Sequence, residues 1–160
     1  LNNNFVEKCN EYIKYGIQIL WQCGKNDFNH LNKLIHNQDI HLIPFCDDMS
    51  SLYSASDLII SRSGALALSE MAFMGKAMIL IPFPHSAGNH QFKNAESFSN
   101  SGAAILIPQN KLNSGELENT AIKLLNNPEK IFNMEKRSIQ LASPNATDII
   151  TNSIIKMATS

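Results

Sequence analysis

Short apolar runs alternate along this chain with stretches whose apolar residues are spaced as on one face of a helix. Five short runs are mostly apolar, without a regular alternation of polar and apolar positions of the kind that marks a strand with one wet face. Such runs predict strands covered on both sides, joined by helices. We expect the strands near residues 17–22, 40–43, 57–61, 77–81 and 103–107.

The intervening stretches predict helices, several of them with a polar residue suited to cap the first turn. Asp27, Asp48 and Ser114 are the expected caps of three of them. The predicted helices cover residues 3–15, 28–35, 49–55, 65–74, 89 or 90 to 101, 115–126, 128–142 and 145–157. Strands alternating with helices indicate an α/β fold with a Rossmann-like, doubly wound parallel sheet. Ligands of such sheets bind outside the carboxyl ends of the strands, where loops 44–48, 61–65 and 82–91 would meet.

One stretch, residues 57–70, reads as a buried strand, a tight turn and the start of a helix. Ser63 is a suitable N-cap, and Gly64 allows a ligand or another backbone to approach closely. Free N–H groups at such a helix start favour an anion, above all a phosphate. Glu70 lies further along the same helix, where a carboxylate could accept hydrogen bonds from sugar hydroxyls. The same residues also fit an ordinary strand–helix unit that binds nothing.

Composition narrows the class of protein. The chain has 160 residues, enough for one domain with a real core, and a net charge of −1. This balance gives no support for nucleic-acid binding. No apolar run approaches the roughly 20 residues of a membrane span.

The three cysteines, Cys9, Cys23 and Cys46, lack metal-ligand spacing, so we expect reduced thiols, no metal and no cofactor. The chain opens on Leu1 at a helical pattern, which suggests a piece of a longer protein.

Three sequence blocks, taken together, resemble the MurG family of glycosyltransferases. The first covers residues 57–65 and 68–70, and includes Arg62-Ser63-Gly64-Ala65. The second is Pro82-Phe83-Pro84-His85 with Asn89-His90-Gln91 and residues 94–95, and the third is residues 45–49. The blocks stand in the family's order and spacing, and the resemblance covers essentially the whole chain.

The resemblance implies the C-terminal half of a GT-B glycosyltransferase, in which two Rossmann-like domains face a cleft. Residues 1–160 would form the domain that binds UDP-N-acetylglucosamine (UDP-GlcNAc). The N-terminal acceptor domain, and a glycine-rich loop just before the first helix, would lie outside this chain. The implied substrate-binding residues are Phe45, Cys46, Arg62, Ser63, Gly64, Ala65, Leu66, Ala67, Leu68, Ser69, Glu70, His90 and Gln91.

Within that set the resemblance assigns individual roles. The backbone of Cys46 would read the uracil edge, and N–H groups around Gly64 would meet the diphosphate. Glu70 would bind the ribose hydroxyls, and His90 with Gln91 would lie near the GlcNAc hydroxyls or the diphosphate. No catalytic residue is expected in this chain.

The implied reaction is an inverting, metal-independent transfer of GlcNAc to the 4-hydroxyl of lipid I, giving lipid II for peptidoglycan. It would take place on the cytoplasmic face of the bacterial cell membrane, with acceptor and membrane contacts made by the missing domain. This chain alone would be inactive. The alternatives are a stand-alone donor subunit of a split glycosyltransferase acting on a polyprenol-linked acceptor, a UDP-sugar epimerase of the same fold, and a binding module without enzymatic activity.

Overall fold

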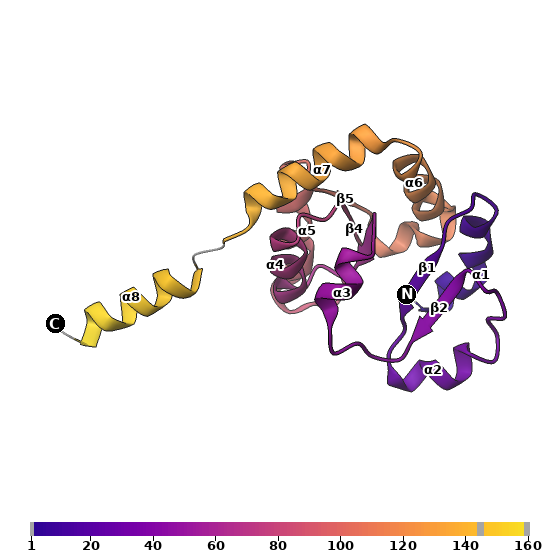
Figure 1. Ribbon diagram of the computed structural model, residues 1–160, viewed down its shortest axis with the longest axis horizontal. Coiled ribbons are helices and arrows are strands. Elements are labelled where there is room, and N and C mark those ends of the chain that lie inside the picture. Colours follow the sequence, from indigo (N-terminus) through magenta and orange to yellow (C-terminus); the bar gives the residue numbers. More distant parts are fainter. Residues whose placement is uncertain (1, 144–145, 159–160) are drawn as a thin grey trace.

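The computed structural model describes residues 2–143 and 146–158 of the chain (Figure 1). Every predicted strand forms; the second matches its predicted bounds, and each of the other four is two residues shorter than predicted. The strands are β1 Ile19–Gln22, β2 Ile40–Ile43, β3 Ile59–Ser61, β4 Met78–Leu80 and β5 Ala104–Leu106. The α-helices are α1 Asn2–Ile13, α2 Lys25–Leu31, α3 Met49–Ser54, α4 Ala65–Phe73, α5 His90–Asn100, α6 Glu116–Leu125, α7 Pro128–Leu141 and α8 Ala146–Ala158. Two short 3₁₀ helices, η1 Ala87–Asn89 and η2 Gln109–Ser114, lie in the loops after β4 and β5.

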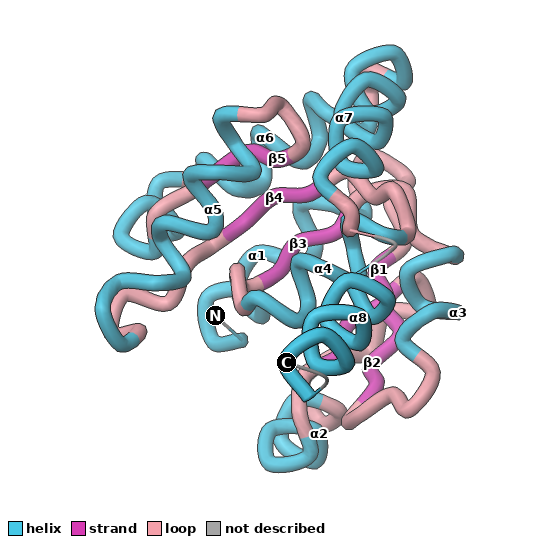
Figure 2. Tube along the Cα trace, turned by 90° about the vertical axis from the view of Figure 1, so that its left-hand side faces the viewer, coloured by secondary structure: helices cyan, strands magenta, loops and turns pink. Residues whose placement is uncertain are grey.

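All strand pairs in the described part of the chain are parallel, which confirms the predicted α/β class. β1 pairs with β2 from Ile19 against Ile40, while β3, β4 and β5 pair in that order. The predicted single sheet is therefore divided into two hydrogen-bonded groups. Figure 2 shows β3, β4 and β5 side by side, with β1 and β2 forming the second group.

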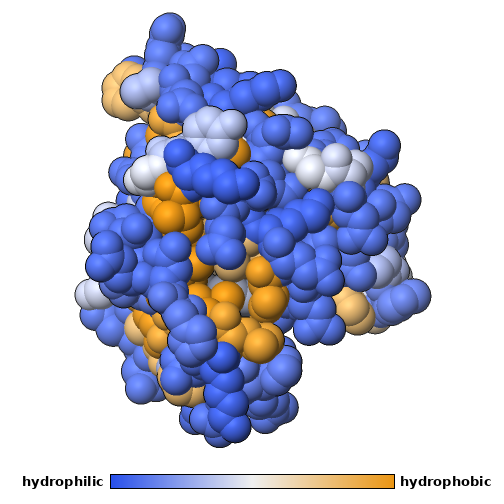
Figure 3. All heavy atoms as spheres, turned by 90° about the vertical axis from the view of Figure 1, so that its right-hand side faces the viewer, coloured by the Kyte–Doolittle hydropathy of each residue, from blue (hydrophilic) through white to orange (hydrophobic). Residues whose placement is uncertain are grey.

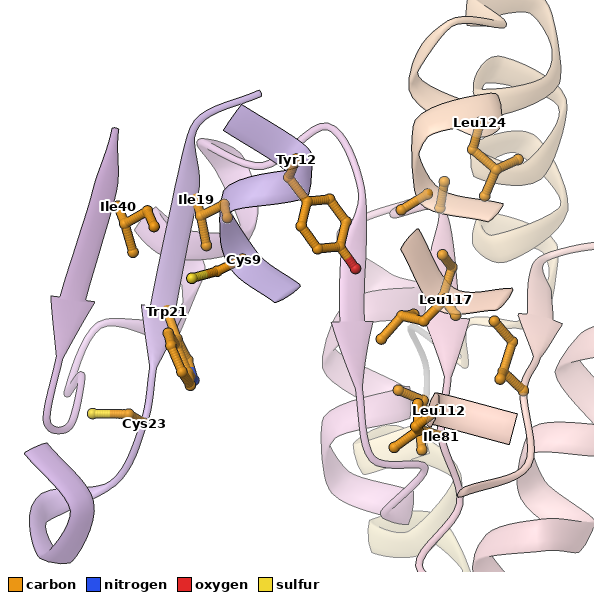
Figure 4. Close-up of a cluster of buried hydrophobic side chains, with 14 of the residues drawn as sticks. Cys9, Tyr12, Ile19, Trp21, Cys23, Ile40, Ile81, Leu112, Leu117 and Leu124 are labelled. Carbon is orange, nitrogen blue, oxygen red and sulfur yellow. The ribbon is translucent and has the colours of Figure 1, made fainter. Parts of the chain in front are cut away.

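Helices cover both faces of β4, whose alternate residues point to opposite sides. In β1, by contrast, only Ile19 and Trp21 are buried, so the prediction that every strand is covered on both sides is wrong there. Ile79 and Ile81 pack with α1 and α6 in one buried cluster, whereas Met78 and Leu80 pack with α3, α4 and α5 in another. The larger cluster also takes in β1, so it spans both groups of strands (Figure 4). β4 is buried along its whole length, as its unbroken apolar run predicts.

The predicted caps Asp27 and Ser114 are wrong, and in both cases a glycine takes the capping position. Asp27 lies inside the first turn of α2, where it accepts a hydrogen bond from Asn2 Nδ2 at 2.7 Å, and Gly24 is the N-cap. Ser114 ends η2, and its hydroxyl donates to the Lys111 carbonyl at 2.7 Å. Gly115, at φ 79°, begins α6 instead, because a sharp change of direction there requires the left-handed region.

The C-terminal helix α8 extends away from the other elements (Figure 1). Its predicted first residue, Asn145, lies outside the described residues. Within the part of the chain that the structure describes, no helix combines the length and apolar character needed to cross a membrane.

Candidate functional site

Parallel strands place their carboxyl ends at a common edge, and most of the predicted site residues follow those ends. Phe45 and Cys46 come after β2, Arg62 to Gly64 after β3, and the loop 81–89 after β4. This edge is where an open parallel sheet binds ligands.

The N-terminus of α4 is open at this edge. Gly64 is its N-cap, at φ −66° and ψ 140°, and no side chain caps the helix. The first helical bond runs from the Leu68 N–H to the Gly64 carbonyl at 3.0 Å, so the N–H groups of residues 65–67 precede the hydrogen-bond ladder. Ala65 and Leu66 are exposed. Uncapped N–H groups and the positive end of the helix dipole together attract an anion.

Ser63 does not cap α4 as predicted. Its side chain is fully buried, and its hydroxyl donates to the Gln91 carbonyl at 2.7 Å. Asn94 Nδ2 in turn donates to the Ser63 carbonyl at 3.1 Å. Both bonds reach across to α5, so Ser63 fastens the turn before α4 to a second helix. A partner 28 residues away competes successfully with the local cap, and no local pattern signals it.

Arg62 is held by neutral acceptors. Its Nη1 donates to the carbonyls of Ile81 and Pro82, each at 3.1 Å, and its Nη2 donates to Gln109 Oε1 at 2.7 Å. The guanidinium also lies over the Phe83 ring, 5.5 Å from its centroid. Burial lowers its pKa. Arg62 thus ties the end of β4 and the following loop to η2; sequence reasoning missed the part played by Gln109.

The loop after β4 ends in two consecutive residues with left-handed backbone. Gly88 has φ 54° and Asn89 has φ 56°, and α5 begins at the exposed His90. Gln91 Oε1 accepts from the Phe83 N–H at 2.9 Å, and Ser86 Oγ accepts from the Gln91 N–H at 3.3 Å. The Gln91 Nε2 group has no partner among the described residues, so it remains available as a hydrogen-bond donor.

Glu70 lies on α4, about one and a half turns after the open N-terminus. Its Oε2 accepts from the Tyr53 hydroxyl of α3 at 3.0 Å, and it forms no ion pair within the described residues. Burial and, to a smaller extent, this hydrogen bond to Glu70 raise the pKa of Tyr53 to about 12. Because a phenol satisfies only one acceptor site of a carboxylate, the remaining lone pairs of Glu70 can accept further donors.

Phe45 and Cys46 form a separate group near the end of β1. The Phe45 ring is 53% exposed and lies 5.2 Å from Lys25 Nζ. The Cys46 N–H donates to Gln22 Oε1 at 3.2 Å. A base approaching this backbone would therefore have to displace the Gln22 amide or use the Cys46 carbonyl. Gln22, the last residue of β1, is a second neighbour that sequence reasoning missed.

The remaining predicted residues contribute less through their side chains. Leu68 is 3% exposed and belongs to the core between α4 and β4, while Ala67 packs against that core. The Ser69 hydroxyl donates to the Ala65 carbonyl at 3.0 Å within the helix.

A cavity of about 530 Å³ lies between α4, α5 and the end of α7. Four predicted site residues reach it, namely Ala65, Leu68, Ser69 and Glu70. Phe45, Arg62, Gly64 and Gln91 do not line it. The other nine predicted site residues therefore lie outside this cavity.

Comparison with known proteins decides the family. Residues 2–151 match the model of the glycosyltransferase family 28 C-terminal domain. The chain belongs to this family. The resemblance to MurG is confirmed as well, since the curated relatives include proteins named UDP-N-acetylglucosamine–N-acetylmuramyl-(pentapeptide) pyrophosphoryl-undecaprenol N-acetylglucosamine transferase.

One of these family 28 relatives, from Flavobacterium psychrophilum, is 38% identical over 160 residues, which is 100% of this chain and 43% of the relative. Another, from Porphyromonas gingivalis, is 32% identical, covering 98% of this chain and 42% of the relative. The crystal structure of Acinetobacter baumannii MurG matches with a TM-score of 0.79 at 28% identity, covering 96% of this chain and 46% of that one. The chain thus spans less than half the length of the relatives it matches.

Proposed function

We propose that this domain binds UDP-GlcNAc and is the donor-binding half of an inverting glycosyltransferase that converts lipid I to lipid II. The observation that carries the proposal is the open N-terminus of α4, with Glu70 further along the same helix. An anion site and a sugar-hydroxyl acceptor at this spacing suit a nucleoside diphosphate. The names of the relatives supply the donor sugar and the acceptor.

The proposed contacts follow from the chemistry of each group. The N–H groups of Ala65, Leu66 and Ala67 meet the diphosphate, and Glu70 accepts from the ribose hydroxyls. The Phe45-Cys46 backbone faces the uracil. The exposed His90 and the free Nε2 donor of Gln91 lie toward the GlcNAc end. Ser63 and Arg62 hold the loops that carry these groups.

In the proposed reaction the acceptor hydroxyl attacks the anomeric carbon of GlcNAc, and UDP leaves with its electron pair. Negative charge grows on the diphosphate as this bond breaks. Fixed N–H groups and the helix dipole of α4 stabilise that charge without reorganising, which is the form of electrostatic catalysis available to this half. No His, Cys, Asp or Glu cluster suited to a metal occurs among the described residues.

The acceptor site, the general base and the membrane contact belong, in this proposal, to the part of the protein outside this chain. The enzyme would work at the cytoplasmic face of the bacterial membrane as a peripheral protein.

The test is a transfer assay with the full-length protein, labelled UDP-GlcNAc and lipid I, with UDP-glucose and a dolichol-linked GlcNAc acceptor as comparisons. We expect lipid II from UDP-GlcNAc and lipid I only. Transfer to the dolichol-linked acceptor alone would favour a split-enzyme relative, and UDP-GlcNAc epimerisation without transfer would overturn the proposal. The 160-residue chain alone should give no product, because it contains no acceptor half.

A further inference from the structure

Gln109, the first residue of η2, is the one side chain that accepts a hydrogen bond from Arg62 among the described residues. Its Oε1 accepts from Arg62 Nη2 at 2.7 Å, whereas Arg62 Nη1 donates to two backbone carbonyls. A hydrogen bond from a charged donor is stronger than one between neutral groups. Gln109 follows β5 and Arg62 follows β3, so this bond joins two loops at the ligand edge.

From Arg62 the contacts continue into the loop that leads to α5. The Pro82 carbonyl accepts from Nη1 at 3.1 Å, and the guanidinium lies 5.5 Å from the centroid of the Phe83 ring. The Phe83 N–H donates in turn to Gln91 Oε1 at 2.9 Å. Because the oxygen and nitrogen of a carboxamide share one plane, fixing the oxygen also restricts the direction of the Nε2 donor. A continuous set of contacts therefore runs from Gln109 to the amide of Gln91.

The positive charge of Arg62 is held in place without being cancelled. Hydrophilic side chains cover most of the face that Figure 3 shows, but Arg62 is half-buried, and no carboxylate pairs with it among the described residues. Removing a cation from water without a counter-charge is costly, and an anion bound nearby lowers that cost. Arg62 stands two residues before Gly64, the N-cap of α4, so this charge belongs to the same edge as the open helix start.

Glutamine suits position 109 because it combines a hydrogen-bond acceptor with a neutral side chain. Glutamate has the same length and would also accept from Arg62, but it would form an ion pair and cancel the charge of the guanidinium. Alanine would leave Nη2 without this acceptor and release the guanidinium from η2. The two substitutions therefore separate the geometry of the contact from its charge.

We propose that Gln109 is a positioning residue of the donor site. It acts through Arg62 on the loop that presents Gln91 to the sugar, and its neutral amide leaves the charge of Arg62 available to the diphosphate. This inference rests on the proposed function, because it takes UDP-GlcNAc as the ligand.

The test is calorimetric titration of the full-length protein and its Gln109→Ala and Gln109→Glu variants with UDP and with UDP-GlcNAc. Gln109→Ala frees the loop, and should weaken UDP-GlcNAc binding about tenfold but UDP binding only about threefold. Gln109→Glu keeps the hydrogen bond and cancels the charge, so it should weaken the binding of both ligands about tenfold and leave the ratio of their affinities unchanged. A purely structural role would instead weaken both ligands equally in Gln109→Ala, and Gln109→Glu would restore their affinities.

Asn110→Ala is the matched control, since Asn110 follows Gln109 in η2 and is exposed. It should bind both ligands within about twofold of the unmodified protein. NMR spectra recorded without ligand give a second measurement, which does not depend on the substrate. Gln109→Ala should shift the signals of the Phe83 N–H and of Gln91 Nε2, and Asn110→Ala should leave both signals in place.

Unmoved Phe83 and Gln91 signals in Gln109→Ala, or equal losses for the two ligands in that variant, would overturn the inference and leave UDP-GlcNAc as the donor. Unchanged affinities in Gln109→Glu would overturn it as well, because the charge of Arg62 would then not serve the diphosphate. An unmodified protein that binds neither UDP nor UDP-GlcNAc would overturn the proposed function, and this inference with it.

Discussion

Two helices, α3 and α4, both begin at the ligand edge, but a side chain caps the first turn of α3 and no side chain caps that of α4. At α3, the Asp48 carboxylate accepts from the Ser51 N–H at 3.2 Å and from the Ser50 hydroxyl at 2.6 Å. The Ser51 hydroxyl also donates to this carboxylate. Together these hydrogen bonds lower the pKa of Asp48 to about 2, and the two serine hydroxyls have the largest effect. At α4, Gly64 offers no side chain and the N–H groups stay open.

The backbone does not require glycine at this position. Gly64 has φ −66°, which any residue adopts, and a Cβ placed there would meet no heavy atom within 4 Å. A capping side chain would therefore fit. The comparison teaches that a helix start can be completed by its own chain, as at α3, or left for an anion, as we propose for α4.

The largest effect on UDP binding is expected when α4 is given a cap like that of α3. Gly64→Asp places a carboxylate where the diphosphate is proposed to bind, and should weaken UDP binding about 100-fold. The same change should raise the free energy of unfolding by about 0.5 kcal/mol, since Asp is a better cap than Gly and suits the helix dipole. Calorimetric titration and chemical denaturation measure the two effects.

Gly64→Ala is the matched control, because it fills the same open space without a charge or an acceptor. It should bind UDP within about threefold of the unmodified protein. A loss as large as that of Gly64→Asp would show that bulk at residue 64, and not competition for the N–H groups, is responsible.

The next largest effect is expected at Glu70. A carboxylate bonded to ribose hydroxyls contributes about 1.5–3 kcal/mol per charge-assisted hydrogen bond, so Glu70→Ala should weaken UDP binding about tenfold or more. Tyr53→Phe removes only the phenol that Glu70 already accepts from, and should change affinity by no more than about threefold. Equal losses in the two variants would indicate that Glu70 acts by holding α3 against α4.

The next effect on binding is smaller, and it distinguishes recognition of the sugar from recognition of the nucleotide. Gln91→Ala removes the free Nε2 donor, and should weaken UDP-GlcNAc binding more than UDP binding by about 1 kcal/mol. Because Gln91 Oε1 also holds the Phe83 N–H, both ligands should lose some affinity through the loop. An equal loss for the two ligands would assign Gln91 to the loop alone.

The smallest effect on binding is expected at the capped helix. Asp48→Asn should lower the midpoint of thermal unfolding and leave UDP affinity unchanged within about twofold. The folded pKa of Asp48 is depressed from 3.8 to about 2, so its stabilisation is complete above pH 3.8 and is lost as the pH falls through about 2. The midpoints of the two proteins, measured by calorimetry, should therefore converge in acid.

The strands and the family could be predicted because their signals are local. Unbroken apolar runs predict strands such as β4, and the Asp48 cap and its three-residue reach lie within one turn. The sequence blocks of the MurG family are likewise contiguous. Patterns of this kind need no knowledge of which distant segments meet.

The sequence did not reveal hydrogen bonds to distant partners, and the predicted Ser63 cap is wrong for that reason. The Ser63 hydroxyl turns to Gln91, and Arg62 turns to Gln109, 47 residues away. The Cys46 N–H donates to Gln22 Oε1, at the end of another strand. Gln22 and Gln109 carry no motif of their own, so only the arrangement of the strands reveals them.

The central claim is that the open start of α4 holds a diphosphate while the capped start of α3 does not. An NMR titration of backbone amides with UDP, and separately with uridine, tests it most directly. We expect UDP to shift the amides of Ala65, Leu66 and Ala67 strongly, uridine to leave them almost unmoved, and Ser50 and Ser51 to respond to neither. Shifts at α4 that uridine reproduces in full, or an α4 start that UDP leaves unmoved, would contradict the account.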